Sequence, residues 1–320
     1  MNLQFLVSDD LWDFPFFKRL AANDTGSAPG HQGGLVIPKD LRTFFPDLSG
    51  GPSAAAPTVD REIRAVLLVA GRCVDTVRTR YQFQTWGAKR RPESRLTGNL
   101  RGLRNQAQAG DYLLFQRSNS DADLYRLSLI KRGSSDYDAL TKLTGDATWG
   151  TIEGYRPLSQ QDIVASLAEQ NTRQAGPFSP FDSSLVATET RAMRVARSLV
   201  FSRTVRAIYG GVCCVCGTAL RSPAGQVEID AAHIVPRGQQ GTDDARNGLA
   251  LCKRHHWAFD RGLFGINRDR TVIVPRGVAD IRQNQLLAVL AGKPMREATD
   301  KSLAAHPEAL EWHRINILVS

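Results

Sequence analysis

Residues 213–262 read CCVCGTALRSPAGQVEIDAAHIVPRGQQGTDDARNGLALCKRHHWAFDRG, and this stretch contains two pairs of metal-binding residues. Cys213-x2-Cys216 and Cys252-x2-His255 are separated by 35 residues. The gap of two residues within each pair lets neighbouring side chains reach one tetrahedral ion. The spacing therefore predicts a structural zinc site with these four ligands, which stabilises the carboxy-terminal part of the chain.

The same stretch holds more polar residues than a zinc site needs. His233 and Asn247 lie between the two pairs, and His256 follows the expected ligand His255. This order of His, Asn and His, together with HWAFDRG at residues 256–262, resembles the HNH family of nucleases. The resemblance implies a ββα-metal site that hydrolyses phosphodiester bonds, with His233, Asn247 and His256 as its catalytic residues.

The resemblance also implies a division of roles. In such a site a histidine removes a proton from water, and a divalent ion stabilises the charge that develops on the phosphate. His233 is the expected general base. Many family members have an acidic metal ligand immediately before the base, but here that position is Ala232, and the nearest carboxylate is two positions earlier, on the same side of an extended strand. The candidate ligands for Mg²⁺ or Mn²⁺ are Asp230, Asn247, His256 and Asp260.

Two readings of this region stay open. Asn247 either braces its loop or contacts the metal. A structural zinc module, in which the histidines only bind zinc or pack, would contain the same Cys and His residues. The Asp and Asn residues between and after the pairs favour the catalytic reading. Cys214 has a poorer spacing to Cys216 than Cys213 has, and we expect it to pack in the core.

The amino-terminal half contains a basic stretch. From Arg72 to Arg104 there are nine Lys and Arg residues against two acidic ones, interleaved with aromatic and amide side chains. Arginine can pair with guanine edges and Gln or Asn with adenine, while further cations hold phosphates. This composition favours a DNA-binding surface, although a charged run is often only a solvated face.

Three segments in this half resemble the DNA-binding pseudobarrel of EcoRII-type restriction enzymes, a fold shared with plant B3 domains. They are residues 22–39 (ANDTGSAPGHQGGLVIPK), 77–87 (VRTRYQFQTWG) and 95–99 (RLTGN). In that family two arms flank the major groove. The resulting candidates for DNA contact are His31, Gln32, Arg78, Arg80, Tyr81, Gln82, Trp86, Arg90, Arg91, Arg95 and Asn99.

The patterns predict an α+β protein with two domains. Short strands are expected at residues 34–38, 63–70, 74–83, 111–116 and 124–131, and helices at 159–170, 188–209 and 280–290. We expect a recognition domain over residues 1–160, a linker over 161–190 and a zinc-containing HNH domain over 191–320. A loop is expected between Leu48 and Thr58, where small residues and prolines gather.

Composition and charge are consistent with this division. The 320 residues have a net charge of +9, which favours a polyanionic partner. Four of the five cysteines lie in the metal window, which fits a reducing compartment, and Cys73 is expected to be a small buried residue. The first 20 residues contain several charges and no long apolar run. We therefore expect a cytoplasmic protein without a membrane span.

Together the two halves predict a site-specific restriction endonuclease that binds double-stranded DNA. One alternative is a modification-dependent enzyme whose barrel recognises methylcytosine or hydroxymethylcytosine. Another is a DNA-binding regulator that does not cut, although retention of His233 argues against it. Because one HNH site is arranged for one scissile phosphate, a homodimer is expected for double-strand cleavage.

Overall fold

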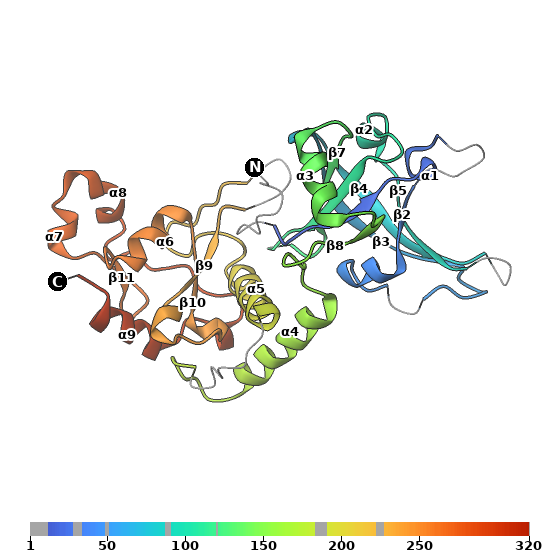
Figure 1. Cartoon of the computed structure of the whole chain (residues 1–320). Coiled ribbons are helices and arrows are strands. Elements are labelled where there is room, and N and C mark those ends of the chain that lie inside the picture. The colour runs from blue at the N-terminus through green and yellow to red at the C-terminus, as the bar shows by residue number, and fades with distance from the viewer. Residues whose placement is uncertain are drawn as a thin grey trace. The chain divides into compact units, whose positions relative to one another are not determined.

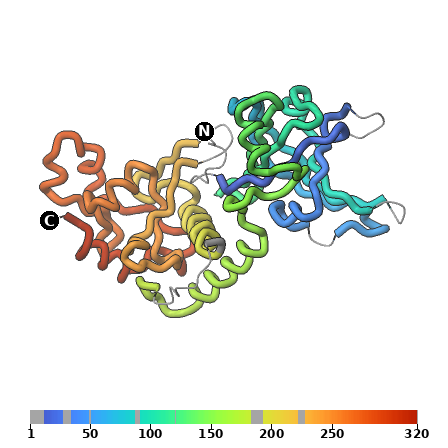
Figure 2. The backbone as a smooth tube through the Cα atoms, viewed as in Figure 1, coloured from blue at the N-terminus to red at the C-terminus, as the bar shows by residue number. Residues whose placement is uncertain are grey.

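The computed structural model describes residues 12–27, 34–48, 51–86, 91–119, 121–182, 191–221 and 227–319. The chain divides into two compact units, Met1–Gln161 and Asp162–Ser320. Figure 2 traces their backbones, with the remaining residues in grey. No helix in the described ranges is both long and apolar enough to cross a membrane.

The first unit is built on one curled sheet of eight strands, a half-barrel (Figure 1). The strand order is β2-β5-β4-β3-β7-β6-β1-β8, and β3 and β7 form its parallel pair. The strands are β1 (Phe16–Arg19), β2 (Leu35–Ile37), β3 (Thr58–Val69), β4 (Arg72–Gln84), β5 (Glu93–Thr97), β6 (Tyr112–Arg117), β7 (Leu124–Ile130) and β8 (Trp149–Thr151). This architecture confirms the expected fold class.

The hairpin of β3 and β4 forms the centre of the sheet. Alternate residues Ile63, Ala65, Leu67 and Val69 are buried in the core, as the two-residue period of a strand requires. The chain then reverses through Ala70 and Gly71, whose φ angles of 48° and 73° are typical of a tight hairpin turn.

The first unit also contains short helices and a core of stacked aromatic rings. The helices are α1 (Ala22–Thr25), η2 (Lys39–Phe44), α2 (Arg101–Arg104) and α3 (Ser135–Thr144). Helix α3 begins after Ser134, whose hydroxyl accepts a hydrogen bond from the Tyr137 amide. In the core, the ring of Phe45 stacks on Tyr81 and Tyr125 with centroids 4.6 and 5.1 Å away.

Two details of the first unit differ from the expectation. The strands β1, β5 and β8 were not expected, since three to five residues give little periodic signal; β2 is as short, but its residues Leu35–Ile37 are all apolar. Cys73 is exposed and not buried, because the first five residues of β4 are all exposed.

The second unit contains a small ββα element. The ββα element consists of β9 (Asp230–His233), β10 (Gly248–Leu251) and α6 (Lys253–Asp260). Before it come α4 (Gln160–Ala175) and α5 (Arg191–Ile208), and the short helices η3 (Arg237–Gln239) and η4 (Ala245–Asn247) lie between its strands. Strands β9 and β10 pair antiparallel, with His233 opposite Gly248 and Asp230 opposite Leu251. Helix α5 packs on both strands. A Cβ at Gly248 would lie 2.4 Å from Val205 of α5, so only glycine permits this approach.

The rest of the second unit is made of short elements. They are β11 (Gly265–Ile266), β12 (Val272–Ile273), α7 (Arg276–Ala279), η5 (Arg282–Asn284), α8 (Gln285–Ala288), η6 (Lys301–Leu303) and α9 (Pro307–Asn316). The single helix expected at residues 280–290 is instead divided between η5 and α8.

The linker expected over residues 161–190 contains most of helix α4. Helix α4 continues to Ala175, and residues 162–182 belong to the second compact unit. The polar side chains of Gln170 and Arg173 contact the loop between β9 and β10, which we call the 234–247 loop.

Candidate functional site

The four predicted zinc ligands lie together. The ligand atoms of Cys213, Cys216, Cys252 and His255 are all within 4.8 Å of one another. His255 Nδ1 lies 3.4 Å from Cys213 Sγ and 3.1 Å from Cys252 Sγ. Tetrahedral zinc holds sulfur at about 2.3 Å and nitrogen at about 2.0 Å, which places neighbouring ligands roughly 3.5 Å apart. The Cys3His cluster therefore fits zinc.

Local structure explains how these ligands meet. The chain turns tightly after Cys213, whose carbonyl accepts a hydrogen bond from the Gly217 amide at 2.8 Å. Gly217 has a φ of 73°, a conformation that glycine adopts readily. Cys252 is the N-cap of α6, and His255 lies in the first turn of that helix. Cys214 is buried outside the cluster, consistent with a packing role.

His233, the expected base, forms a pair with a carboxylate that no motif had indicated. Its Nε2 lies 2.9 Å from Oδ1 of Asp243, a nearly buried residue in the 234–247 loop. The other oxygen of Asp243 lies 3.0 Å from Arg237 Nη1. On the ring face, Phe201 of α5 stacks on the imidazole with centroids 4.0 Å apart. These contacts fix the ring plane, and a proton on Nε2 leaves the lone pair on Nδ1.

Asn247 lies inside the 234–247 loop and is fully buried. Its Oδ1 accepts a hydrogen bond from the Val235 amide at 2.9 Å. Its Nδ2 donates to the carbonyls of Val235 and Thr242 at 3.1 and 2.9 Å. Both amide hydrogens are therefore used within the loop. This geometry favours the bracing role of Asn247 over direct contact with a metal.

The other three candidate ligands form a chain of contacts on the ββα element. Asp230 Oδ2 lies 2.9 Å from His256 Nδ1, and His256 Nε2 lies 3.5 Å from Asp260 Oδ2. Asp230 Oδ1 also accepts a hydrogen bond from Lys253 Nζ at 2.8 Å. Carboxylate oxygens and an imidazole nitrogen suit a small divalent cation such as Mg²⁺ or Mn²⁺. The donor types therefore suit the expected ion, with Asp230 and Asp260 on opposite nitrogens of the His256 ring.

The contacts among Asp230, His256 and Asp260 also shift the pKa values of these groups. The hydrogen bond that His256 donates to the Asp230 carboxylate raises the pKa of His256. Although burial opposes it, the hydrogen bonds from His256 and Lys253 lower the pKa of Asp230. Burial raises the pKa of Asp260 against the opposing influence of His256 and, more weakly, of His233. Asp260 therefore lies within electrostatic reach of both histidines.

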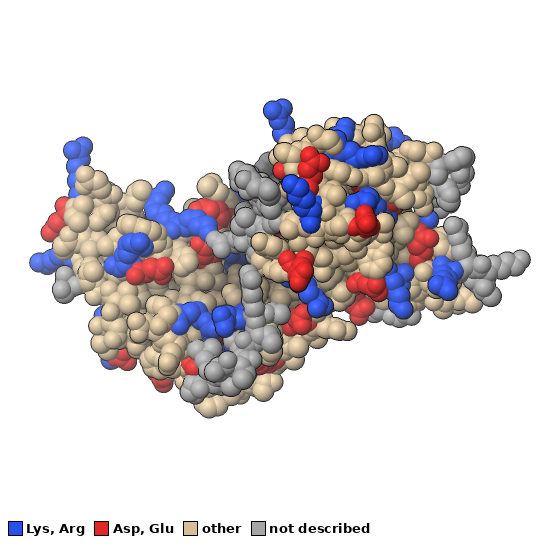
Figure 3. All heavy atoms as spheres, in the orientation of Figure 1, with Lys and Arg blue, Asp and Glu red and all other residues tan. Residues whose placement is uncertain are grey.

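Several of the predicted DNA contacts are exposed in the first unit. Arg78 and Arg80 lie on β4 and pair with Glu62 and Asp60 of β3 at 2.8 and 3.6 Å. Trp86 is exposed as well, and so are Asn99 and Arg91. A cavity of about 870 Å³ is lined by Arg78, Asn99, Arg101 and Arg104, among others. On the face drawn in Figure 3, Lys and Arg side chains lie among Asp and Glu side chains.

Three other candidates are buried in the first unit. Tyr81 is only 3% exposed and stacks in the core on Phe45, because it alternates with the outward-facing Arg80 along β4. Gln82 is 5% exposed and bonded to Gln84. Arg95 is paired with Glu93 at 2.5 Å. In this structure Tyr81 is a core residue, and Gln82 and Arg95 belong to a buried polar network. His31, Gln32 and Arg90 lie outside the described residues.

Comparison with known proteins finds a family for each unit. A model described as "HNH endonuclease" matches residues 213–267, and one described as "Restriction endonuclease EcoRII, N-terminal" matches residues 12–144. Both resemblances seen in the sequence are therefore confirmed. Residues 145–212 and 268–320 lie outside both matches.

The solved structures that are similar to the chain include two from restriction enzymes. "Modification dependent TagI restriction endonuclease" is 13% identical, with a TM-score of 0.33 over 91% of this chain and 96% of that one. The "N-terminal domain of Helicobacter pylori LlaJI.R1" is 13% identical, with a TM-score of 0.29 over 43% of this chain and 96% of that one. No curated protein matches the chain.

Proposed function

We propose that this DNA-cleaving hydrolase, which carries an HNH endonuclease domain and an EcoRII-type amino-terminal domain, is a restriction enzyme whose first unit selects the DNA and whose second unit cuts it. On this proposal residues 1–161 form the recognition domain and residues 162–320 the nuclease domain, following the two compact units.

One observation supports the cutting role most strongly. The pair of His233 and Asp243 and the chain from Asp230 through His256 to Asp260 lie on the same ββα element. A carboxylate-oriented histidine beside a set of oxygen and nitrogen donors is what metal-assisted hydrolysis of a phosphodiester requires. A module that only bound zinc would need none of these five residues.

In the proposed mechanism His233 acts as the general base. Asp243 accepts the Nε2 proton of His233 in a hydrogen bond, so that Nδ1 takes the proton from the attacking water. Asn247 holds the 234–247 loop in place through its three hydrogen bonds. Asp230 with Nδ1 of His256, or Asp260 with Nε2 of the same ring, would hold Mg²⁺ or Mn²⁺. When bound, the ion would stabilise the negative charge that develops on the phosphate.

The recognition role is proposed for the exposed polar residues of the first unit. Arg78 and Arg80 are paired with acidic residues at the surface, and such pairs are worth little in water. DNA phosphates or guanine edges can therefore replace the acidic partners at low cost. Trp86, Asn99 and Arg91 are further exposed candidates.

A digestion experiment tests this function. Plasmids with unmodified, methylated or hydroxymethylated cytosine are incubated with the protein and Mg²⁺ or Mn²⁺, and the cut ends are sequenced. Cuts at fixed positions in unmodified DNA would support a site-specific enzyme, and cuts only in modified DNA would support the modification-dependent alternative. The absence of cleavage on every substrate would contradict the proposed function.

We further propose that two chains cooperate in double-strand cleavage. The sequence contains one HNH set, made of His233, Asn247 and His256, which suits one scissile phosphate at a time. Because the two strands of DNA are antiparallel, a two-fold pair of sites matches a symmetric target. Excess His233→Ala protein mixed with active protein should turn linear product into nicked circles. A monomer that nicks sequentially would give the same ratio of products at equal extent of reaction.

A further inference from the structure

The segment of residues 162–182 lies outside both family matches and packs against the loop that carries Asp243. We propose that α4 and the turn after it position the general base, with Gln170 and Arg173 as positioning residues that act on His233 through Asp243. This inference rests on the proposed role of His233.

Gln170 connects α4 directly to Asp243. Its side chain is nearly buried, and its Nε2 donates a hydrogen bond to the Asp243 carbonyl at 3.2 Å. Its Oε1 accepts a hydrogen bond from the Thr204 hydroxyl of α5 at 2.9 Å. Helix α5 also supplies Phe201, which stacks on His233. One amide group thus links the helix behind the imidazole ring with the backbone of its carboxylate partner.

The turn after α4 pairs with the 234–247 loop through the main chain. The Asp182 amide donates to the Gln240 carbonyl at 2.9 Å, and the Thr242 amide donates to the Pro180 carbonyl at 3.1 Å. On its other side the loop is tightly folded, since a Cβ at Gly241 would lie 1.8 Å from the Val235 carbonyl oxygen. The loop is therefore held from outside by residues 180–182 and from inside by Asn247.

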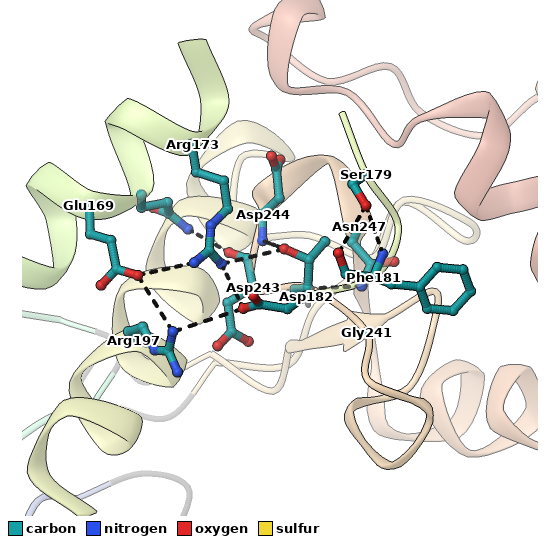
Figure 4. Close-up of polar contacts among 12 residues, drawn as sticks. Glu169, Arg173, Ser179, Phe181, Asp182, Arg197, Gly241, Asp243, Asp244 and Asn247 are labelled. Carbon is teal, nitrogen blue, oxygen red and sulfur yellow. Dashed lines mark hydrogen bonds and ion pairs between the residues drawn. The ribbon is translucent and has the colours of Figure 1, made fainter. Parts of the chain in front are cut away.

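Four charged side chains join this turn to α4 and α5, as Figure 4 shows. Arg173 lies 3.0 Å from Glu169 and 3.2 Å from Asp182, whereas Arg197 lies 3.5 and 3.9 Å from the same two acids. Arg173 Nη1 also donates to the Thr242 hydroxyl at 3.4 Å. The side chains of Asp182 and Arg197 are only 5% and 10% exposed, so water and salt screen this pair less than a surface pair.

Arg246 holds the loop on the carboxy-terminal side of Asp243. It donates to the carbonyls of Gly176 and Arg173 at 3.1 and 3.2 Å, at the end of α4. It also binds both oxygens of Asp244. Thr242 and Asp244, the two neighbours of Asp243, are therefore each tied to the α4 segment.

These contacts serve a purpose beyond covering the core. A helix that only covers a core buries apolar side chains, yet two of the three buried residues of α4, Ser166 and Gln170, are polar. Because Asp243 Oδ1 lies 2.9 Å from His233 Nε2, a shift of about 1 Å in the loop would disturb the hydrogen bond that orients the base.

The test uses the full-length protein with Gln170→Ala, and Asn171→Ala as the control. Asn171 is the next residue of α4 and is exposed. We expect Gln170→Ala to lower the single-turnover cleavage rate about 10-fold, with DNA affinity and zinc content unchanged. Gln170→Glu, which keeps the size and the acceptor for Thr204 but loses the donor to Asp243, should lower the rate as well. Asn171→Ala should cut like the wild type.

A double-mutant cycle separates positioning from folding. If Gln170 acts through Asp243, then adding Gln170→Ala to Asp243→Asn should lower the rate by less than about 2-fold further. Independent, additive losses would overturn the proposal. So would a lowered melting temperature without any change in the rate of the folded protein.

A measurement that does not depend on cleavage is the tautomer of the His233 ring, followed by NMR of protein labelled with ¹⁵N-histidine. The His233 ring, assigned by its loss in His233→Ala, should carry its proton on Nε2 in the wild type and become a mixture of tautomers in Gln170→Ala. An unchanged tautomer would overturn this inference alone. Full cleavage by His233→Ala would instead remove the proposed base and leave the function in question.

Discussion

The two units of this protein use arginine in different ways. In the proposed recognition unit, Arg78 and Arg80 are mostly exposed, and each pairs with an acidic side chain on the surface of the neighbouring strand. In the nuclease unit, Arg197 and Arg246 are shielded, and their partners hold the loop of Asp243. Exposed pairs exchange easily for another anion, whereas shielded pairs fix geometry. On the proposed function, charge would serve DNA binding in the first unit and positioning of the base in the second.

The largest expected effect is on the stability of the nuclease unit, when a ligand of the zinc cluster is removed. Cys252→Ser should remove the cooperative melting transition of the nuclease unit, because metal binding contributes on the order of 10 kcal/mol to the folding of such small units. The recognition unit should melt as before. Calorimetry with elemental analysis checks both, and about one zinc per chain is expected in the wild type. A nuclease transition that a chelator leaves unchanged would contradict the zinc assignment.

A smaller effect is expected on the unfolding free energy of the nuclease unit at acidic pH. Burial lowers the pKa of His313, which stacks on Phe259, from its usual value to about 4. The unfolded chain therefore takes up a proton below about pH 6.5 that the folded chain does not. The stability of the nuclease unit should be fully present above pH 6.5 and fall by about 3 kcal/mol as the pH approaches 4.

The matched variant for this effect is His313→Phe, which keeps an aromatic ring on Phe259. Its unfolding free energy, measured by denaturant titration at several pH values, should depend less on pH than that of the wild type. Five of the six histidines lie in residues 162–320, so the recognition unit should be the less acid-sensitive of the two. Equal pH slopes for variant and wild type would exclude His313 as the cause.

The smallest effect on stability is expected for the exposed arginines. Arg78→Ala or Arg80→Ala should change the unfolding free energy by less than about 0.5 kcal/mol, because each removes only a surface pair. DNA binding should weaken, and competition between specific and random duplexes shows how. A greater loss on the specific duplex would indicate base contact. Equal loss on both, with a shallower salt dependence, would make them phosphate contacts.

The features that could be predicted from the sequence depend on local spacing. The zinc ligands meet because each pair is closed by one turn, at Gly217 and at the start of α6. The order of His233, Asn247 and His256 was sufficient to identify the ββα element. The long strands β3 and β4 were also evident, since their periods extend over many residues.

The features that could not be predicted depend on distant contacts. Asp243 is one of two adjacent acids in a loop, and only the folded loop brings it to His233. A linker was expected over residues 161–190, and the contacts of its polar helix with the 234–247 loop carry no signal in the sequence. Strand alternation alone separates buried Tyr81 from exposed Arg80, but the burial of Gln82 depends on contacts with neighbouring side chains.

The division of labour between the units is tested most directly with full-length His233→Ala. Its binding to unmodified and modified duplexes is measured beside its cleavage rate. We expect cleavage to fall by at least about 100-fold, while DNA affinity, zinc content and both melting transitions stay as in the wild type. Near-wild-type cleavage by this variant, or loss of DNA binding together with cleavage, would contradict the assignment of cutting to His233 and of recognition to the amino-terminal unit.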